Sequence, residues 1–85
     1  MTNKIKEVAR MFNKSGQFAS TNEDTKEVNT ELETKGINYE IFKVFVEDDK
    51  YTIRVERNGS TLGHKEVKTI EEIEEVLRFR IAENQ

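Results

Sequence analysis

The sequence predicts an α+β fold: a three-stranded antiparallel meander with N- and C-terminal helices packed on one of its faces. Apolar residues recur at helical spacing near both ends of the chain, whereas β-branched and aromatic residues dominate residues 37–67. An Asn-Gly pair at 58–59 is the strongest short signal for a β-hairpin. The 85 residues leave room for one domain, residues 1–85, with a thin core.

Composition excludes several classes of site. The chain has no cysteine, which rules out disulfides, thiolate zinc sites and a cysteine nucleophile, and its single histidine rules out a multi-histidine metal site within one chain. No apolar run approaches the ~18 residues of a membrane span. The N-terminus lacks the apolar segment of a signal peptide. We therefore expect a cytoplasmic protein without cofactor, metal or membrane contact.

Charge is unevenly distributed along a chain whose net charge is −3. Residues 1–14 carry four basic residues against one acidic residue, whereas residues 15–49 carry nine acidic against three basic ones. The negative charge of this middle segment weakens non-specific attraction to the phosphates of nucleic acids. Two interpretations stay open: an ordinary solvated surface, or an acidic surface for a basic partner.

The first helix is predicted over residues 3–14. Ile5, Val8, Ala9 and Phe12 follow the spacing that places apolar side chains on one helical stripe. Gly16 is a plausible stop for this helix.

The polar segment 15–36 is the least informative part of the chain. Ser20 and Glu23 resemble a capping box, which suggests a weak helix over about 22–34 that docks through Val28 and Leu32. Partial disorder is the alternative, because so few apolar side chains offset the entropy cost of ordering the backbone.

The meander follows from two turns of two residues each, at Asp48-Asp49 and Asn58-Gly59. Directly opposed residues share a face of a sheet. The resulting pairs are Val46 with Tyr51, Val44 with Ile53, Phe42 with Val55, Val55 with Leu62, and Ile53 with His64. This register places the large apolar side chains on one face, and it places His64 on that face as a structural residue.

The C-terminal helix is predicted over residues 69–83. Thr69 and Glu72 form a capping box, and Glu74 and Arg78 form a favourable pair four residues apart. The buried stripe is expected to consist of Ile70, Ile73, Leu77 and Ile81.

The leading hypothesis for function is a small non-enzymatic module that binds a protein partner, or a second copy of itself. Two helices cover only one side of the sheet, so Tyr39, Ile41 and Phe45 are expected on the open side unless segment 15–36 wraps over them. Phe79 is expected on the outer side of its helix. Clustered exposed apolar side chains usually mark a contact surface. We find no convergent nucleophile, acid and base, and predict no catalysis and no small-molecule substrate.

The alternative hypothesis is nucleic-acid binding by Lys43, Arg54 and Lys65, which the same register places together on the outer face. Basic residues beside aromatic rings bind single strands by stacking and phosphate contact. The rings here are those of Tyr39 and Phe45.

The order of elements resembles the double-stranded-RNA-binding domain over residues 22–81. The resemblance runs through Tyr39-Glu40 at the start of the first strand and Gly63-His64-Lys65 before the second helix. It implies a lysine-rich helix start that grips phosphates, but the matching stretch from Thr69 to Glu75 is acidic. In composition the chain also resembles small accessory proteins of phages and mobile elements.

Overall fold

The computed structural model describes residues 3–36 and 38–85. In chain order its elements are α1 (Asn3–Lys14), β1 (Ser20–Asn22), β2 (Glu27–Leu32), β3 (Glu40–Val46), β4 (Tyr51–Arg57), β5 (Ser60–Val67) and α2 (Ile70–Glu83). The predicted α+β class is confirmed, and so are the two helices.

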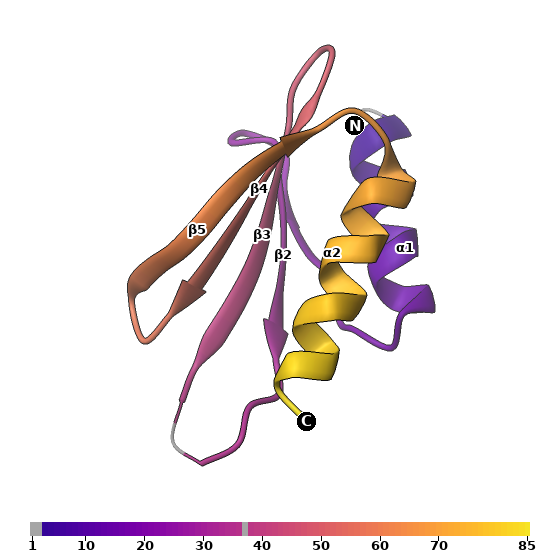
Figure 1. The fold of residues 1–85 in the computed structure, drawn as a ribbon. Coiled ribbons are helices and arrows are strands. Elements are labelled where there is room, and N and C mark those ends of the chain that lie inside the picture. Colours follow the sequence, from indigo (N-terminus) through magenta and orange to yellow (C-terminus); the bar gives the residue numbers. More distant parts are fainter. Residues whose placement is uncertain (1–2, 37) are drawn as a thin grey trace.

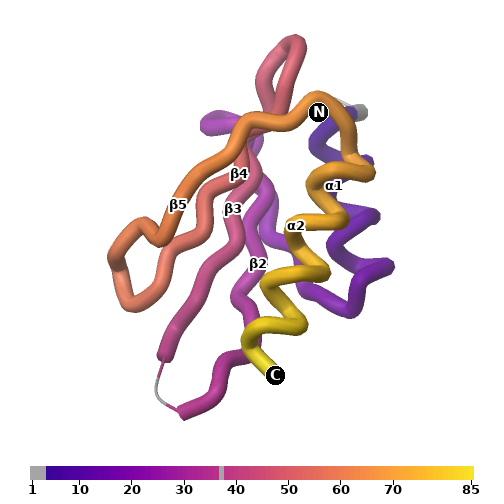
Figure 2. Tube along the Cα trace, viewed as in Figure 1, coloured from indigo at the N-terminus to yellow at the C-terminus, as the bar shows by residue number. Residues whose placement is uncertain are grey.

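The sheet is an antiparallel meander in the order β1-β2-β3-β4-β5. It has five strands where the sequence predicted three. Both helices pack on the same face, so the opposite face of the sheet carries no helix, as predicted (Figure 1). The tube view follows the chain through the meander and shows β5 at one edge of the sheet (Figure 2).

The expected helix over 22–34 is wrong, because this stretch contributes β1 and β2, whereas partial disorder of residues 15–36 stays a prediction. Oδ1 of Asn22 accepts hydrogen bonds from the backbone N–H groups of Asp24 (3.0 Å) and Thr25 (3.2 Å). These bonds start a turn instead of a helix. Along β2, Val28, Thr30 and Leu32 alternate inward and are buried. Two further strands therefore precede β3, and the resemblance to the RNA-binding domain fails.

The predicted register of β3 and β4 is confirmed. Val46 opposes Tyr51, Val44 opposes Ile53 and Phe42 opposes Val55, and all six side chains are buried. The hydrophobic pattern and the short turn agree, which fixes the register strongly because a slip by one residue would turn every side chain to the other face.

The predicted register of β4 and β5 is wrong beyond the turn. Asn58 and Gly59 adopt positive φ (52° and 84°) as expected, but a bulge follows, so that Thr61 opposes Glu56 whereas Gly63 opposes Val55. The extra residue of a bulge shifts all later pairs by one position. The predicted positions of two side chains in β5 are therefore wrong. Leu62 is not buried opposite Val55 but 53% exposed, and His64 opposes Arg54 on the outer face instead of Ile53 on the inner face.

The core lies between the inner face of the sheet and the two helices. From α1 it receives the predicted stripe of Ile5, Val8 and Phe12. The Phe12 ring packs edge-on against Phe42 of β3, with ring centroids 5.8 Å apart. This aromatic contact attaches α1 to the centre of the sheet.

The capping box at the start of α2 is expected to stabilise the folded chain. The Thr69 hydroxyl accepts the N–H of Glu72, and the Glu72 carboxylate accepts the N–H of Thr69. Replacing Thr69 with alanine removes the acceptor, so the free energy of unfolding should fall by about 1 kcal/mol in urea titrations followed by circular dichroism. Thr69→Ser keeps the oxygen and should cost far less. Equal losses in the two variants would contradict a capping role.

Candidate functional site

The outer face of the sheet is open, but it is not a continuous apolar surface. Segment 15–36 does not wrap over it: β2 extends the sheet beside β3 and turns Val28 and Leu32 inward. Of the three contact residues predicted on this face, Tyr39 is 48% exposed and precedes β3, while Ile41 and Phe45 are half-buried.

Charged side chains occupy the space between these apolar residues. The guanidinium carbon of Arg54 lies 5.2 Å from the centroid of the Phe45 ring. Glu56 lies within ion-pair distance of both Lys43 (3.3 Å) and Arg54 (3.6 Å). A cation over an aromatic face, an ion pair across two strands and an ion pair along one strand are typical of a solvated sheet surface.

The basic cluster of the nucleic-acid hypothesis does not form as expected. Lys43 and Arg54 are direct cross-strand partners, as predicted. Lys65, however, opposes Ile53, which belongs to the inner face. The bulge in β5 therefore places Lys65 on the opposite face from Lys43 and Arg54. Glu56 already forms ion pairs with both Lys43 and Arg54.

A groove lies between α2 and the strands β4 and β5. Its volume is about 210 Å³, and it is lined by Ile53, Val55, Leu62, Gly63, His64, Lys65, Val76 and Arg80. By register the side chain of His64 belongs to the outer face, so His64 borders the groove through its backbone. The helices do not cover most of β5, which leaves room for the groove. Of the eight residues of β5, only Val67 is buried.

Two large apolar side chains are exposed on the elements that form this groove, one of them in its lining and the other elsewhere on α2. Leu62, displaced by the bulge, is 53% exposed and lines it from β5. Phe79 is 61% exposed on α2 and follows Val76, a groove residue, by three positions, which places the two on adjacent sides of the helix. Val76 itself packs partly against the core. The predicted exposure of Phe79 is confirmed, whereas sequence analysis missed Leu62.

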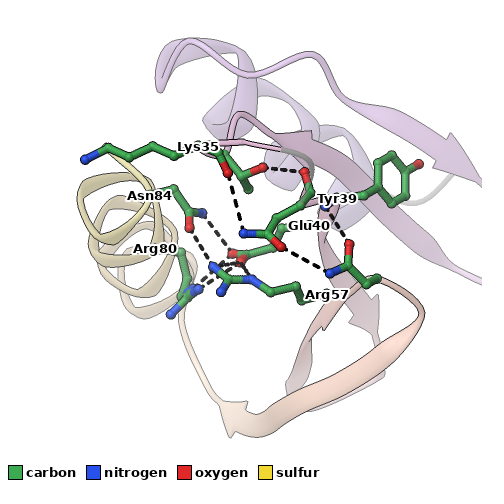
Figure 3. Close-up of polar contacts among 9 residues, drawn as sticks. Lys35, Tyr39, Glu40, Arg57, Arg80 and Asn84 are labelled. Carbon is green, nitrogen blue, oxygen red and sulfur yellow. Dashed lines mark hydrogen bonds and ion pairs between the residues drawn. The ribbon is translucent and has the colours of Figure 1, made fainter.

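A buried carboxylate positions the helix that forms one wall of the groove. Glu40 has no exposed surface and precedes Phe42, Val44 and Val46 in the inward alternation of β3. Arg57, Arg80 and Asn84 converge on it (Figure 3). The shortest contact joins Nη2 of Arg80 to Oε1 of Glu40, at 2.8 Å. This cluster fixes the C-terminal end of α2 to the ends of β3 and β4.

The cluster changes the acidity of its members. Burial raises the pKa of Glu40, but hydrogen bonds from Arg80, Asn84 and Arg57, together with the charge of Arg80, outweigh burial and leave this pKa below its usual value of 4.5. The hydrogen bond to Glu40 raises the pKa of Arg80. Glu40 therefore stays ionised and keeps both guanidinium groups in place. Sequence analysis missed this residue, although its alternation with the apolar residues of β3 was a usable signal.

Other kinds of site find little support within residues 3–36 and 38–85. No group of three or more histidine, cysteine, aspartate or glutamate side chains there is arranged to hold a metal ion. In the same ranges, neither helix has the length and apolar character to cross a bilayer. Comparison with protein-family models, curated proteins and solved structures finds no match to this chain.

Proposed function

We propose that this chain is a non-enzymatic protein-interaction module and that its partner binds at the groove between α2 and β5. The observation that carries the proposal is the exposure of Leu62 in an apolar groove and of Phe79 on the helix that forms one wall of it. An 85-residue chain that is 34% hydrophobic has few large apolar residues, and burying such a side chain stabilises by about 1.5–3 kcal/mol. Two such side chains exposed to water on the two elements that form one groove indicate a surface that is covered in a complex.

The size and chemistry of the groove favour a protein over a small molecule. Its volume of about 210 Å³ lies below the ~300–1,000 Å³ that is usual for small-molecule sites. Its lining is mainly aliphatic, with Lys65 and Arg80 as the charged side chains, and it brings together no nucleophile with a general base. A side chain from a partner segment is an occupant of suitable size.

The outer face of the sheet is a weaker candidate for the contact site than the groove. There Ile41 and Phe45 stand four residues apart on one strand with Lys43 between them, and Arg54 covers Phe45. Little apolar surface would be gained by covering that face. The two faces can be compared directly, because each offers two apolar residues for substitution.

Selection of displayed peptides tests this proposal. Short random peptides are selected for binding to the wild-type chain, and the affinities of the enriched peptides are then measured on variants. Leu62→Ser and Phe79→Ser should each weaken binding by about tenfold or more, which corresponds to the loss of one buried contact of about 1.4 kcal/mol.

The matched controls are Ile41→Ser and Phe45→Ser on the outer face, with folding of all four variants verified by circular dichroism. They should leave the affinities within about twofold of wild type. If the outer-face variants abolish binding and the groove variants do not, the contact lies on the outer face. If all four variants bind like wild type, neither surface is the interface.

A further inference from the structure

The groove is positively charged in a chain that is negative overall. Lys65 and Arg80 line it, and no carboxylate is among the described residues of its lining, although acidic residues outnumber basic ones by 17 to 14 in the sequence. Glu72 and Glu83 lie near Lys65 and Arg80, respectively, as neighbours outside the lining. The carboxylate of Glu72 is occupied by the N–H groups of Lys68 and Thr69.

The buried cluster has one positive charge in excess, and one of its two guanidinium groups, that of Arg80, lines the groove. Two guanidinium groups, of Arg57 and Arg80, share the single carboxylate of Glu40. The Arg80 side chain is 20% exposed, and its contacts with Glu40 use Nε and Nη2. Within the part of the chain that the structure describes, Nη1 of Arg80 has no such contact, so it can donate to an incoming acceptor. A carboxylate fits this position because it accepts charge-assisted hydrogen bonds from arginine.

The strand beside the groove has one free edge. β5 is the last strand of the sheet, and beyond the bulge it pairs regularly with β4 from Gly63 to Val67. Among the residues that the structure describes, no strand pairs with its other side, and the backbone donors and acceptors there are a template for an added strand. The opposite edge, β1, has only three residues. β5 is therefore the longer of the two edges available for pairing.

Register specifies which side chains an added strand would place over the groove. Gly63 and Lys65 both belong to the inner face, two residues apart. A Cβ at Gly63 would meet nothing within 4 Å, so the space above it can take a side chain from the added strand. An apolar residue opposite Gly63 would lie beside Leu62, and an acidic residue opposite Lys65 would face its ammonium group.

From this we propose that the groove binds an extended segment of a partner protein, in which an apolar and an acidic residue lie two positions apart, as a sixth strand beside β5. This inference rests on the proposed function and specifies the chemistry of the partner. Backbone hydrogen bonds to β5 supply affinity, while the apolar and acidic side chains supply specificity. A basic segment is excluded by Lys65 and Arg80.

Titration with three synthetic peptides, followed by amide chemical shifts, tests the inference. The first peptide alternates leucine and aspartate two positions apart, the second has asparagine for aspartate, and the third has each aspartate moved by one position. The first should shift the amides of β5 and of residues 76–80. It should bind at least about tenfold more tightly than the other two at low salt, and added salt should reduce this advantage.

Two variants of the protein sharpen the test. Lys65→Glu should reverse the preference between the first peptide and a lysine-containing counterpart. Gly63→Val should fill the space and reduce binding by about tenfold or more without unfolding the chain, since Gly63 has no positive φ and valine suits a strand. Arg80 is left intact because it holds Glu40.

Each outcome decides the inference. Tighter binding of the first peptide with shifts along β5 supports it. Equal binding of the aspartate and asparagine peptides overturns the acidic requirement, and shifts on the outer face or on α1 overturn the location. If none of the three peptides binds, while peptides from the display selection still require Leu62 and Phe79, the inference fails and the proposed function stands. If the selected peptides do not require those residues either, the proposed function fails as well.

Discussion

Replacing Glu40 with alanine is expected to lower the free energy of unfolding by about 3 kcal/mol, because two guanidinium groups lose their shared carboxylate. Removing one partner of a buried ion pair costs about 3–5 kcal/mol when the remaining charge is shielded from water. The Arg57 and Arg80 side chains keep 35% and 20% exposure, which permits some solvation and places the loss at the low end. Urea titrations of the variant and the wild type measure it.

The pH dependence of stability identifies Glu40 as the source. Its pKa is lower in the folded chain than the ordinary 4.5, so the unfolded chain binds the proton more readily. Its contribution is therefore complete above about pH 4.5 and is lost as the pH falls through the folded pKa. Glu40→Gln should lack this component. Glu72 also has a lowered pKa, but it is present in both proteins, so the difference between their stability curves isolates Glu40. A difference that does not change with pH would contradict this role.

Replacing Phe12 with alanine is expected to cost about 3–5 kcal/mol of unfolding free energy. Phe12 is fully buried and provides the contact of α1 with Phe42 at the centre of the sheet. Alanine removes the ring and leaves a cavity between the helix and the sheet, which the surrounding backbone fills only in part. The loss is measured by urea denaturation, with the slope of the transition checked against wild type.

A double-mutant cycle separates the edge-on ring contact from general burial. Phe12→Leu and Phe42→Leu keep much of the apolar volume while removing one ring each. Their combined effect should differ from the sum of the single effects by about 0.5–1.5 kcal/mol, the usual size of an aromatic pair interaction. Strict additivity of the two leucine substitutions would show that the rings contribute through burial alone.

For the Phe12→Ala variant itself, a loss of unfolding free energy below about 1 kcal/mol would mean that α1 contributes little to the stability of the fold.

The groove could be predicted from the sequence only in part. The helical periodicity of residues 70–81 placed Phe79 away from the buried stripe, and it is exposed. Leu62 was misplaced because the turn at Asn58-Gly59 was extended in regular register, whereas the strand has a bulge immediately after it. A bulge adds one residue without a reliable local signature, since its position depends on how the strand packs. The exposed leucine and the shift of Lys65 to the inner face both follow from that one residue.

Segment 15–36 shows why a hydrophobic pattern can be ambiguous. Val28 and Leu32 are four residues apart, and that spacing places two side chains on one face of a helix as well as of a strand. Thr30, midway between them, shares their face only in a strand, and it is buried with them. The pairing of β2 with β3 selects the strand, because all six residues of β2 are then in register with a strand that is itself paired with β4.

By itself, the sequence determined the features that arise from neighbouring residues: the two helices with their apolar stripes, the capping box at Thr69, and the pairing of β3 with β4 across a short turn. Periodicity and turn chemistry act over a few residues, so they can be read without knowing the rest of the chain. Only the tertiary structure decided the five-stranded sheet, the bulge and the cluster around Glu40. Arg80 reaches Glu40 from forty residues away, and such a contact depends on how whole elements pack, which no local pattern contains.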